Sequence, residues 1–200
     1  MKFNLHERVK DLITPLLITI LCIVIASSGT SISDVLRYDS EALQAGEIWR
    51  LVTPHFLHLS WSHLAMNMGG LFLVFLFFSR CVTWQYWLSA FLVSSVGISV
   101  LIFYFNPEIR WYVGLSGILH TLFVLGGLAD ILVRKWEGIM FTLLITAKII
   151  YEQNIGPLPG SEESAGGPVL VDAHMYGAIF GALIGLFFLY KNRKKRTIFY

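Results

Sequence analysis

Residues 84–105 read WQYWLSAFLVSSVGISVLIFYF and contain no charged side chain. Because a helix needs about 20 apolar residues to cross a bilayer, this stretch predicts a membrane span. Five further apolar stretches fit the same interpretation. The six predicted spans are Leu12–Ser28, His55–Ser79, Trp84–Phe105, Tyr112–Val133, Gly138–Tyr151 and Val169–Tyr190. We therefore expect an all-α membrane protein built as a bundle of six transmembrane helices.

The composition of the whole chain agrees with this prediction. Of its 200 residues, 56% are hydrophobic and only 14% are charged, whereas soluble domains carry about 25% charged residues. So few charges cannot cover a water-facing surface, which excludes a conventional cytosolic enzyme. The formal net charge of +2 gives no reason to expect nucleic acid as a partner. We expect one membrane domain over residues 1–200, with its core at 12–190 and a basic tail at 191–200.

Positive charges predict the orientation of the spans, because Lys and Arg mark the cytoplasmic side. Six spans bring both termini to one side. That side would hold Lys2, Arg8, Lys10, Arg80, Arg134, Lys135, Lys191, Arg193, Lys194, Lys195 and Arg196, which are 11 of the 15 basic residues. Both termini are therefore expected in the cytoplasm, where the tail can contact anionic lipid headgroups. The loops 29–54 and 152–168, the second beginning with Glu152, are expected outside.

Two of the spans carry a further interpretation. The first has a charged start, an apolar core and small residues at Ala26–Ser28, which are also typical of a cleaved signal peptide. The later spans keep their orientation in either case. The fifth span is short, and Lys148 near its end can extend its ammonium group to the membrane surface.

Histidines are concentrated in the predicted spans. Five of the six lie there, namely His55, His58, His63, His120 and His174. A single histidine is more often a satisfied core residue, but ionisable groups in a bilayer are costly and suggest a functional site. Spans two, four and six run inward and reach His63, Ser116 and His174 after eight, four and five residues. At 1.5 Å per residue all three lie roughly 6–12 Å below the outer surface.

Glycines predict which spans approach closely. Span four opens with Gly114-Leu115-Ser116-Gly117, and span six carries Gly177, Gly181 and Gly185 at four-residue spacing. Small residues at this spacing let membrane helices pack with their backbones close together. Plain helix packing would explain the pattern equally well. If spans four and six meet there, Ser116 and His174 come within hydrogen-bond reach.

The residues at this depth suit acyl transfer. A serine needs a base to become a nucleophile, and His174 is the best candidate. His63, with Asn67 one helical turn later, and the backbone N–H of Ser116 can donate to an oxyanion. We expect no Asp or Glu at this depth, because Asp172 lies nearer the surface on another face of the helix. The pattern therefore predicts a Ser–His dyad.

A metal site is the competing interpretation. Histidines from three helices could hold Zn²⁺. The chain contains no H-E-x-x-H motif, however, and no thiolate or carboxylate is expected at the depth of the histidines. We therefore expect neither a metal nor another cofactor.

Taken together, these residues resemble the rhomboid family of intramembrane serine proteases. The matching pieces are Trp49-Arg50 in the first outer loop, His58-x4-His63-x3-Asn67 on span two, Gly114-Leu115-Ser116-Gly117 opening span four, and Ala173-His174-x2-Gly177-x3-Gly181 on span six. The order, the spacing and the membrane depth of these pieces all agree with the family. Its minimal bacterial form also has six helices.

The resemblance implies a role for each matched residue. Ser116 would be the nucleophile and His174 the general base, with His63, Asn67 and the Ser116 backbone as the oxyanion hole. His58, Gly114, Gly117, His120, Gly177 and Gly181 would support the site, and Trp49 and Arg50 would be structural in the outer loop. Span five and the loop 152–168 would form a lateral gate for a substrate helix.

One position departs from the family pattern. Many rhomboids carry a Tyr four residues after the serine, stacked on the catalytic histidine, where this chain has His120. One helical turn after Ser116, His120 faces the same side. It could pack against His174 or form a hydrogen bond nearby.

The short chain and the stretch Tyr112–His120 look like the rhombosortase branch. That resemblance implies a multi-pass protein of the bacterial inner membrane whose active site opens to the periplasm. Its substrates would be single-pass membrane proteins with a C-terminal Gly-Gly motif, a transmembrane helix and a basic tail, cut near Gly-Gly. Transfer to water or to an amine stays open. The alternatives are a catalytically inactive rhomboid-like protein that binds transmembrane helices and a small His-lined transporter.

Overall fold

The computed structural model describes residues 5–192. Its long helices are α1 (Leu5–Ser27), α4 (Trp61–Phe78), α5 (Trp84–Phe105), α6 (Ser116–Asp130), α7 (Lys135–Ile155) and α9 (Val171–Asn192). Its short elements are the helices α2 (Thr30–Leu36), α3 (Ser40–Gln44) and α8 (Ser161–Ala165), the 3-10 helices η1 (Ile48–Leu51) and η2 (Thr53–Phe56), and the strands β1 (Tyr38–Asp39) and β2 (Trp111–Tyr112). Lys2 and residues 193–200 of the expected basic tail lie outside the described residues.

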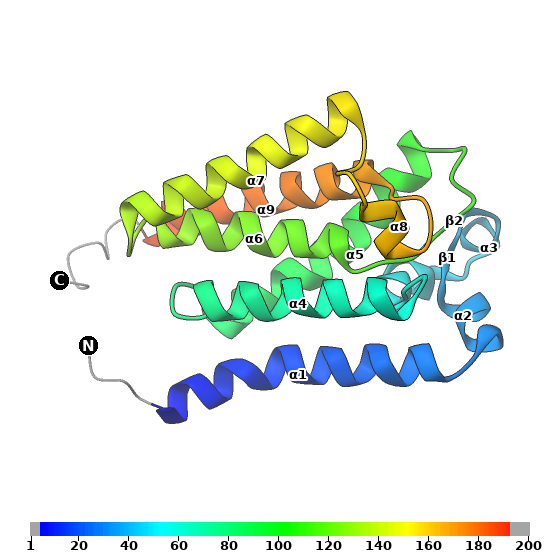
Figure 1. Cartoon of the computed structure of the whole chain (residues 1–200), viewed down its shortest axis with the longest axis horizontal. Helices are drawn as coiled ribbons and strands as arrows, with labels where there is room; N and C mark the ends of the chain where they lie inside the picture. The colour runs from blue at the N-terminus through cyan, green and yellow to red at the C-terminus, as the bar shows by residue number, and fades with distance from the viewer. Residues whose placement is uncertain (1–4, 193–200) are drawn as a thin grey trace.

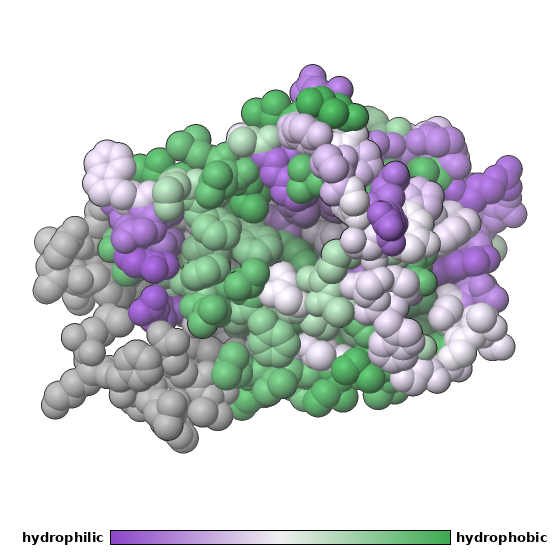
Figure 2. All heavy atoms as spheres, viewed as in Figure 1, coloured by the Kyte–Doolittle hydropathy of each residue, from purple (hydrophilic) through white to green (hydrophobic). Residues whose placement is uncertain are grey.

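The long helices run along one axis as a bundle (Figure 1). The beginning of α1 and the end of α9 lie at one end of it, while α2, α3, α8 and the two strands gather at the opposite end. Figure 2 shows apolar side chains over the middle of one face and hydrophilic ones toward its two ends. This distribution suits a protein whose middle lies in hydrocarbon and whose ends meet water.

Three of these helices, α4, α5 and α9, are long and apolar enough to cross a membrane. The segment Leu12–Ser27 and helix α6 are apolar but shorter. Helix α7 has 21 residues but includes Lys148 and Glu152. The chain is thus a mostly helical membrane protein, and the expected number of six spans stays a prediction.

Several helices do not begin and end where the predicted spans do. The first span was expected from Leu12, but α1 begins at Leu5. The second span was expected from His55, but α4 begins at Trp61, where the Ser60 hydroxyl accepts the His63 backbone N–H at 3.0 Å as an N-cap. The fourth was expected from Tyr112, but α6 begins at Ser116. Gly114 has a φ of 139°, which no helix accommodates. The fifth was expected to end at Tyr151, but α7 continues to Ile155.

Helix α6 lies at the centre of the bundle, and most of its residues are buried. Helix α9 crosses it at distances that only glycine allows. A Cβ atom at Gly177 would collide with the carbonyl oxygen of Gly117, and one at Gly181 would lie 2.6 Å from the carbonyl oxygen of Thr121. The Thr121 hydroxyl also donates to the Gly177 carbonyl at 2.8 Å. The start of α6 and the start of α9 are therefore held together through backbone contact.

The segment before α4 is organised around the buried side chain of Arg50. Its guanidinium donates to the backbone carbonyls of Asp34 at 2.8 Å and Arg37 at 2.7 Å, and to the Glu47 carboxylate at 2.7 Å. The neighbouring Trp49 donates its indole N–H to the Val35 carbonyl at 3.1 Å. This part of the chain also forms a two-stranded antiparallel pairing of β1 with β2, which the all-α expectation did not include.

Candidate active site

Ser116 and His174 face each other across the contact between α6 and α9. Ser116 is the first residue of α6, and His174 lies in the first turn of α9. The Ser116 Oγ lies 2.9 Å from Nε2 of His174, a hydrogen-bond distance. The histidine is only 5% exposed. Both residues line a cavity of about 780 Å³.

His63 and Asn67 line the same cavity from α4. The Nδ1 atom of His63 accepts the backbone N–H of Leu59 at 3.3 Å, so the neutral ring carries its proton on Nε2. The amide nitrogen of Asn67 is buried and has no hydrogen-bond partner among residues 5–192. The backbone N–H of Ser116 begins a helix and has no partner inside it. Three candidate donors therefore belong to residues that line the same cavity.

The two histidines before α4 occupy different surroundings. His55 is fully buried, with Nδ1 3.3 Å from the carbonyl oxygen of Gly114 and Nε2 3.0 Å from that of Ser95. It thereby holds the loop that leads into Ser116. The ring of His58 meets the ring of His63 edge-on, with their centroids 5.0 Å apart. Both histidines were expected inside a span, but both precede the helix.

The expectation that no carboxylate lies beside His174 was wrong. Glu152 belongs to helix α7, not to a loop, and it is only 3% exposed. Its Oε2 atom lies 3.0 Å from Nδ1 of His174, and its Oε1 atom lies 2.7 Å from Nζ of Lys148. The lysine was expected to reach the membrane surface, but it points inward. The four-residue spacing of Lys148 and Glu152 was the sequence signal for this pair.

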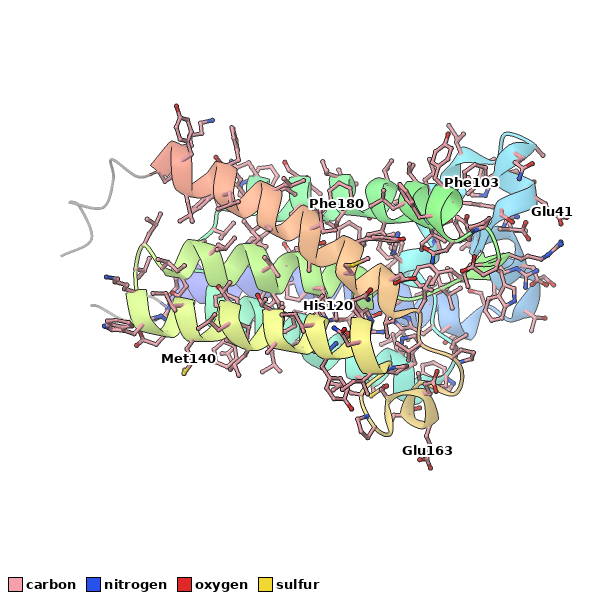
Figure 3. All side chains as sticks on the ribbon, turned by 90° about the horizontal axis from the view of Figure 1, so that it is seen from above. Glu41, Phe103, His120, Met140, Glu163 and Phe180 are labelled. Atoms are coloured by element: carbon pink, nitrogen blue, oxygen red, sulfur yellow. The ribbon has the colours of Figure 1, made fainter. Side chains whose placement is uncertain are left out.

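His120 connects this ion pair to the serine. Its ring stacks on that of His174, with centroids 4.3 Å apart and planes 23° apart. Its Nδ1 atom lies 2.7 Å from the carbonyl oxygen of Ser116, and its Nε2 atom lies 2.9 Å from Nζ of Lys148. Figure 3 shows His120 directed from α6 toward α7. The residue therefore both packs against His174 and forms hydrogen bonds.

Three of these side chains have the geometry of a metal site. His120, Glu152 and His174 offer ligand atoms that lie within 4.8 Å of one another. The ammonium group of Lys148 lies next to these atoms and binds two of the three side chains, His120 and Glu152. Its positive charge would repel a metal ion at this place, so the arrangement favours a hydrogen-bonded network. The expectation of no metal stays a prediction.

The short helix α8 lies beside the start of α4. The Ser60 hydroxyl donates to the carbonyl oxygen of Ala165 at 2.9 Å, and the Ser62 hydroxyl donates to that of Ser164 at 2.6 Å. Ser161 and Ala165 also line the cavity. Helix α8 thus forms part of the cavity wall at the end of the bundle opposite the described termini (Figure 1).

Comparison with known proteins gives a family for this chain. A family model described as Rhomboid domain matches residues 45–191. The matched range covers well over half of the chain and includes every residue of the cavity described above. A comparison with curated proteins finds no match.

Proposed function

The chain belongs to the rhomboid family, which consists of intramembrane serine proteases, and on this premise we propose that it is an active intramembrane serine endopeptidase. The hydrogen bond between Ser116 Oγ and His174 Nε2 is the observation that carries the proposal. A serine next to an unprotonated imidazole nitrogen is the arrangement that activates a hydroxyl for attack. The cavity beside it can admit a peptide segment and the water that the reaction consumes.

The reaction proceeds in two steps. The Ser116 oxygen attacks the scissile carbonyl carbon while His174 takes the hydroxyl proton, and the imidazolium then gives that proton to the departing amine. An acyl-enzyme results. Water attacks it in the second step, with His174 again taking and returning the proton, so that a carboxylic acid is released and the serine is restored.

Donors beside the serine stabilise the negative charge of the tetrahedral intermediate. They are the Nε2–H of His63, the side-chain amide of Asn67 and the backbone N–H of Ser116. The unpartnered amide nitrogen of Asn67 supports this role, because an oxyanion donor has to be available when the charge develops. Gly114 shapes the loop before the serine, and Gly117, Gly177 and Gly181 permit the contact of α6 with α9.

In the membrane, the protein is a single domain over residues 1–200 with six crossing helices: α1, α4, α5, α6, α7 and α9. Its core spans residues 12–190, and the tail at 191–200 is cytoplasmic. Both termini are cytoplasmic, and the distribution of Lys and Arg supports this orientation. The cavity lies near the opposite end, so it opens outward, to the periplasm of a bacterial inner membrane.

The substrate is a single-pass membrane protein with a C-terminal Gly-Gly motif, a transmembrane helix and a basic tail, as in the rhombosortase branch. Helical backbone resists proteolysis because its carbonyls are bonded and shielded. Glycine is a poor helix former, so a Gly-Gly segment unwinds at low cost and brings an accessible carbonyl to Ser116. The cut then falls near Gly-Gly and releases the exported domain.

The test is cleavage of a co-expressed reporter that ends in Gly-Gly, a transmembrane helix and a basic tail. We expect the wild type to cut it, the Ser116→Ala variant to leave it intact, and a matched Ser28→Ala variant at the exposed end of α1 to cut normally. The mass of the new C-terminus locates the cut and separates hydrolysis from transfer to an amine. Cleavage by the Ser116→Ala variant would contradict the proposal, and a bound but uncut reporter would indicate a helix-binding protein.

A further inference from the structure

We propose that Glu152 is a positioning residue for His174, and that Lys148 holds it in place, so that the base works as part of a Ser116–His174–Glu152 series. The inference deepens the proposed function and rests on it. A dyad of Ser116 and His174 alone gives no role to two charged groups next to the base. A carboxylate and an ammonium group, both from α7, are placed behind the base, and the carboxylate is almost completely buried.

With both histidine rings neutral, the hydrogen bonds around the site fit one placement of the protons. A backbone carbonyl only accepts, so Nδ1 of His120 donates to the Ser116 carbonyl, and Nε2 of the neutral ring is an acceptor. That acceptor fits the ammonium group of Lys148, which only donates. A second N–H of Lys148 donates to Oε1 of Glu152. The carboxylate is thereby kept ionised.

The same logic extends to the serine. An ionised carboxylate only accepts, so Nδ1 of His174 donates to Oε2 of Glu152. The neutral ring then has its lone pair on Nε2, where the Ser116 hydroxyl donates at 2.9 Å. This is the tautomer that a general base needs. The hydrogen bonds therefore form a closed series that begins at the Ser116 carbonyl and ends at the Ser116 hydroxyl.

The charges in this series also suit the reaction. When His174 takes the proton of Ser116, its ring becomes positive in a place that is almost closed to solvent. The carboxylate of Glu152, 3.0 Å away, stabilises that charge. Lys148 opposes it but keeps Glu152 from being an unpaired buried anion. If the Lys148–Glu152 pair served only to stabilise α7, the second carboxylate oxygen of Glu152 would not need to lie within hydrogen-bond distance of His174.

The placement of both residues on α7 links the base to that helix. Lys148 and Glu152 lie one turn apart in the C-terminal half of α7, while Ser116 and His174 belong to α6 and α9. The base is oriented correctly only when this half of α7 is packed against α9. His120 also belongs to the series, because its imidazole accepts a hydrogen bond from the Lys148 ammonium group.

The test compares the full-length variants Glu152→Gln and Lys148→Met with the wild type. The controls are Glu137→Gln and Lys135→Met, which make the same changes at exposed positions in the first turn of α7. Each purified protein is reconstituted in liposomes with the Gly-Gly reporter. Three quantities are measured: kcat/KM as a function of pH, the melting temperature, and the rate at which a fluorophosphonate labels Ser116. The labelling rate does not depend on the choice of substrate.

We expect Glu152→Gln to lower kcat/KM and the labelling rate by about 10²–10⁴-fold, because the amide can donate to Nδ1 and select the wrong tautomer. Both controls should match the wild type. Glu152→Gln activity within about threefold of the wild type would overturn the proposal. So would an equal loss in the Glu137→Gln variant.

The pH profile separates positioning from a structural role. The titratable and charged groups that face His174 are His63 of α4, His120 of α6, and Lys148 and Glu152 of α7. Asp172 of its own helix instead accepts a hydrogen bond from Asn106 at 2.7 Å. Loss of the Glu152 carboxylate disfavours the imidazolium, so the acid limb of kcat/KM moves to lower pH. Loss of the Lys148 ammonium favours proton uptake, so the limb moves to higher pH, each by about one unit.

A structural role would lower the melting temperature and activity together and leave the acid limb in place. If the acid limb of kcat/KM stays at the wild-type pH in both variants, the proposal is therefore overturned, even if both variants lose activity. The results for the wild type and the Ser116→Ala variant show whether the role of Glu152 or the proposed protease function has failed. If the wild type neither cleaves nor is labelled at Ser116, the protease itself is refuted. If it does both while Glu152→Gln is unimpaired, only the role of Glu152 is refuted.

Discussion

The imidazole ring of His120 lies flat against that of His174, with the ring centroids 4.3 Å apart. In many rhomboids an aromatic Tyr takes this position, and stacking is the part of its role that a histidine preserves. The histidine adds two ring nitrogens, which bind the Ser116 carbonyl and the Lys148 ammonium. Stacking and hydrogen bonding are thus separate contributions of one side chain, and they can be separated by mutation.

The His120→Tyr variant should keep part of the activity. Its ring can still stack on His174, while Lys148 loses one of its two acceptors and retains Glu152. Loss of one hydrogen bond to a charged group predicts a fall in kcat of about tenfold. The His120→Ala variant loses the stacking as well and should fall further. Turnover of the Gly-Gly reporter measures both, and equal, complete loss in the two variants would show that packing alone does not explain this position.

The contact of α6 with α9 should tolerate no side chain at Gly177. A Cβ atom there collides with a backbone carbonyl that cannot move, whereas one at Gly185 meets the flexible end of Leu128. We expect Gly177→Ala to lower the free energy of unfolding by about 3 kcal/mol or more, and Gly185→Ala by less. Melting in detergent followed by circular dichroism measures both. Gly69→Ala is the control, since nothing lies within 4 Å of its added methyl group, and a Gly177→Ala protein as stable as this control would contradict the packing.

Removal of an oxyanion donor should slow turnover without unfolding the protein. His63→Ala and Asn67→Ala are each expected to lower kcat by about 10²–10³-fold, since each removes one donor from the developing charge. The control is Leu73→Ala on the exposed face of the same helix α4. Rates are measured with the purified enzyme in liposomes. A variant with normal kcat would remove that residue from the oxyanion hole.

The long helices were the most predictable part of the fold. Each contains most of one predicted apolar stretch, because a bilayer requires about 20 apolar residues and few other structures do. The rhomboid resemblance, taken from motifs on three spans and one loop, is confirmed by the family match over residues 45–191. Helix starts were less predictable. The N-cap at Ser60 and the left-handed backbone of Gly114 depend on local conformation, which hydropathy does not report.

The carboxylate beside His174 could not be found by the same reasoning. Hydropathy ends a span where charged residues begin, so Glu152 was assigned to an outer loop. In the structure its charge is matched by Lys148 one turn earlier and by a hydrogen bond from His174. Paired charges of this kind are tolerated inside a membrane bundle. The contact between Ser116 and His174, by contrast, could be predicted. Both residues lie at a similar depth on spans with faces of small residues, and these features can be read from the sequence.

The most direct test of the central claim is the reaction of the purified, reconstituted protein with a fluorophosphonate, followed by mapping of the adduct by mass spectrometry. A serine activated by His174 predicts one adduct per chain, located on Ser116, absent from Ser116→Ala and formed at least about 100-fold more slowly by His174→Ala. The Ser28→Ala protein should react like the wild type. An adduct on another serine, or equal rates with and without His174, would contradict the account.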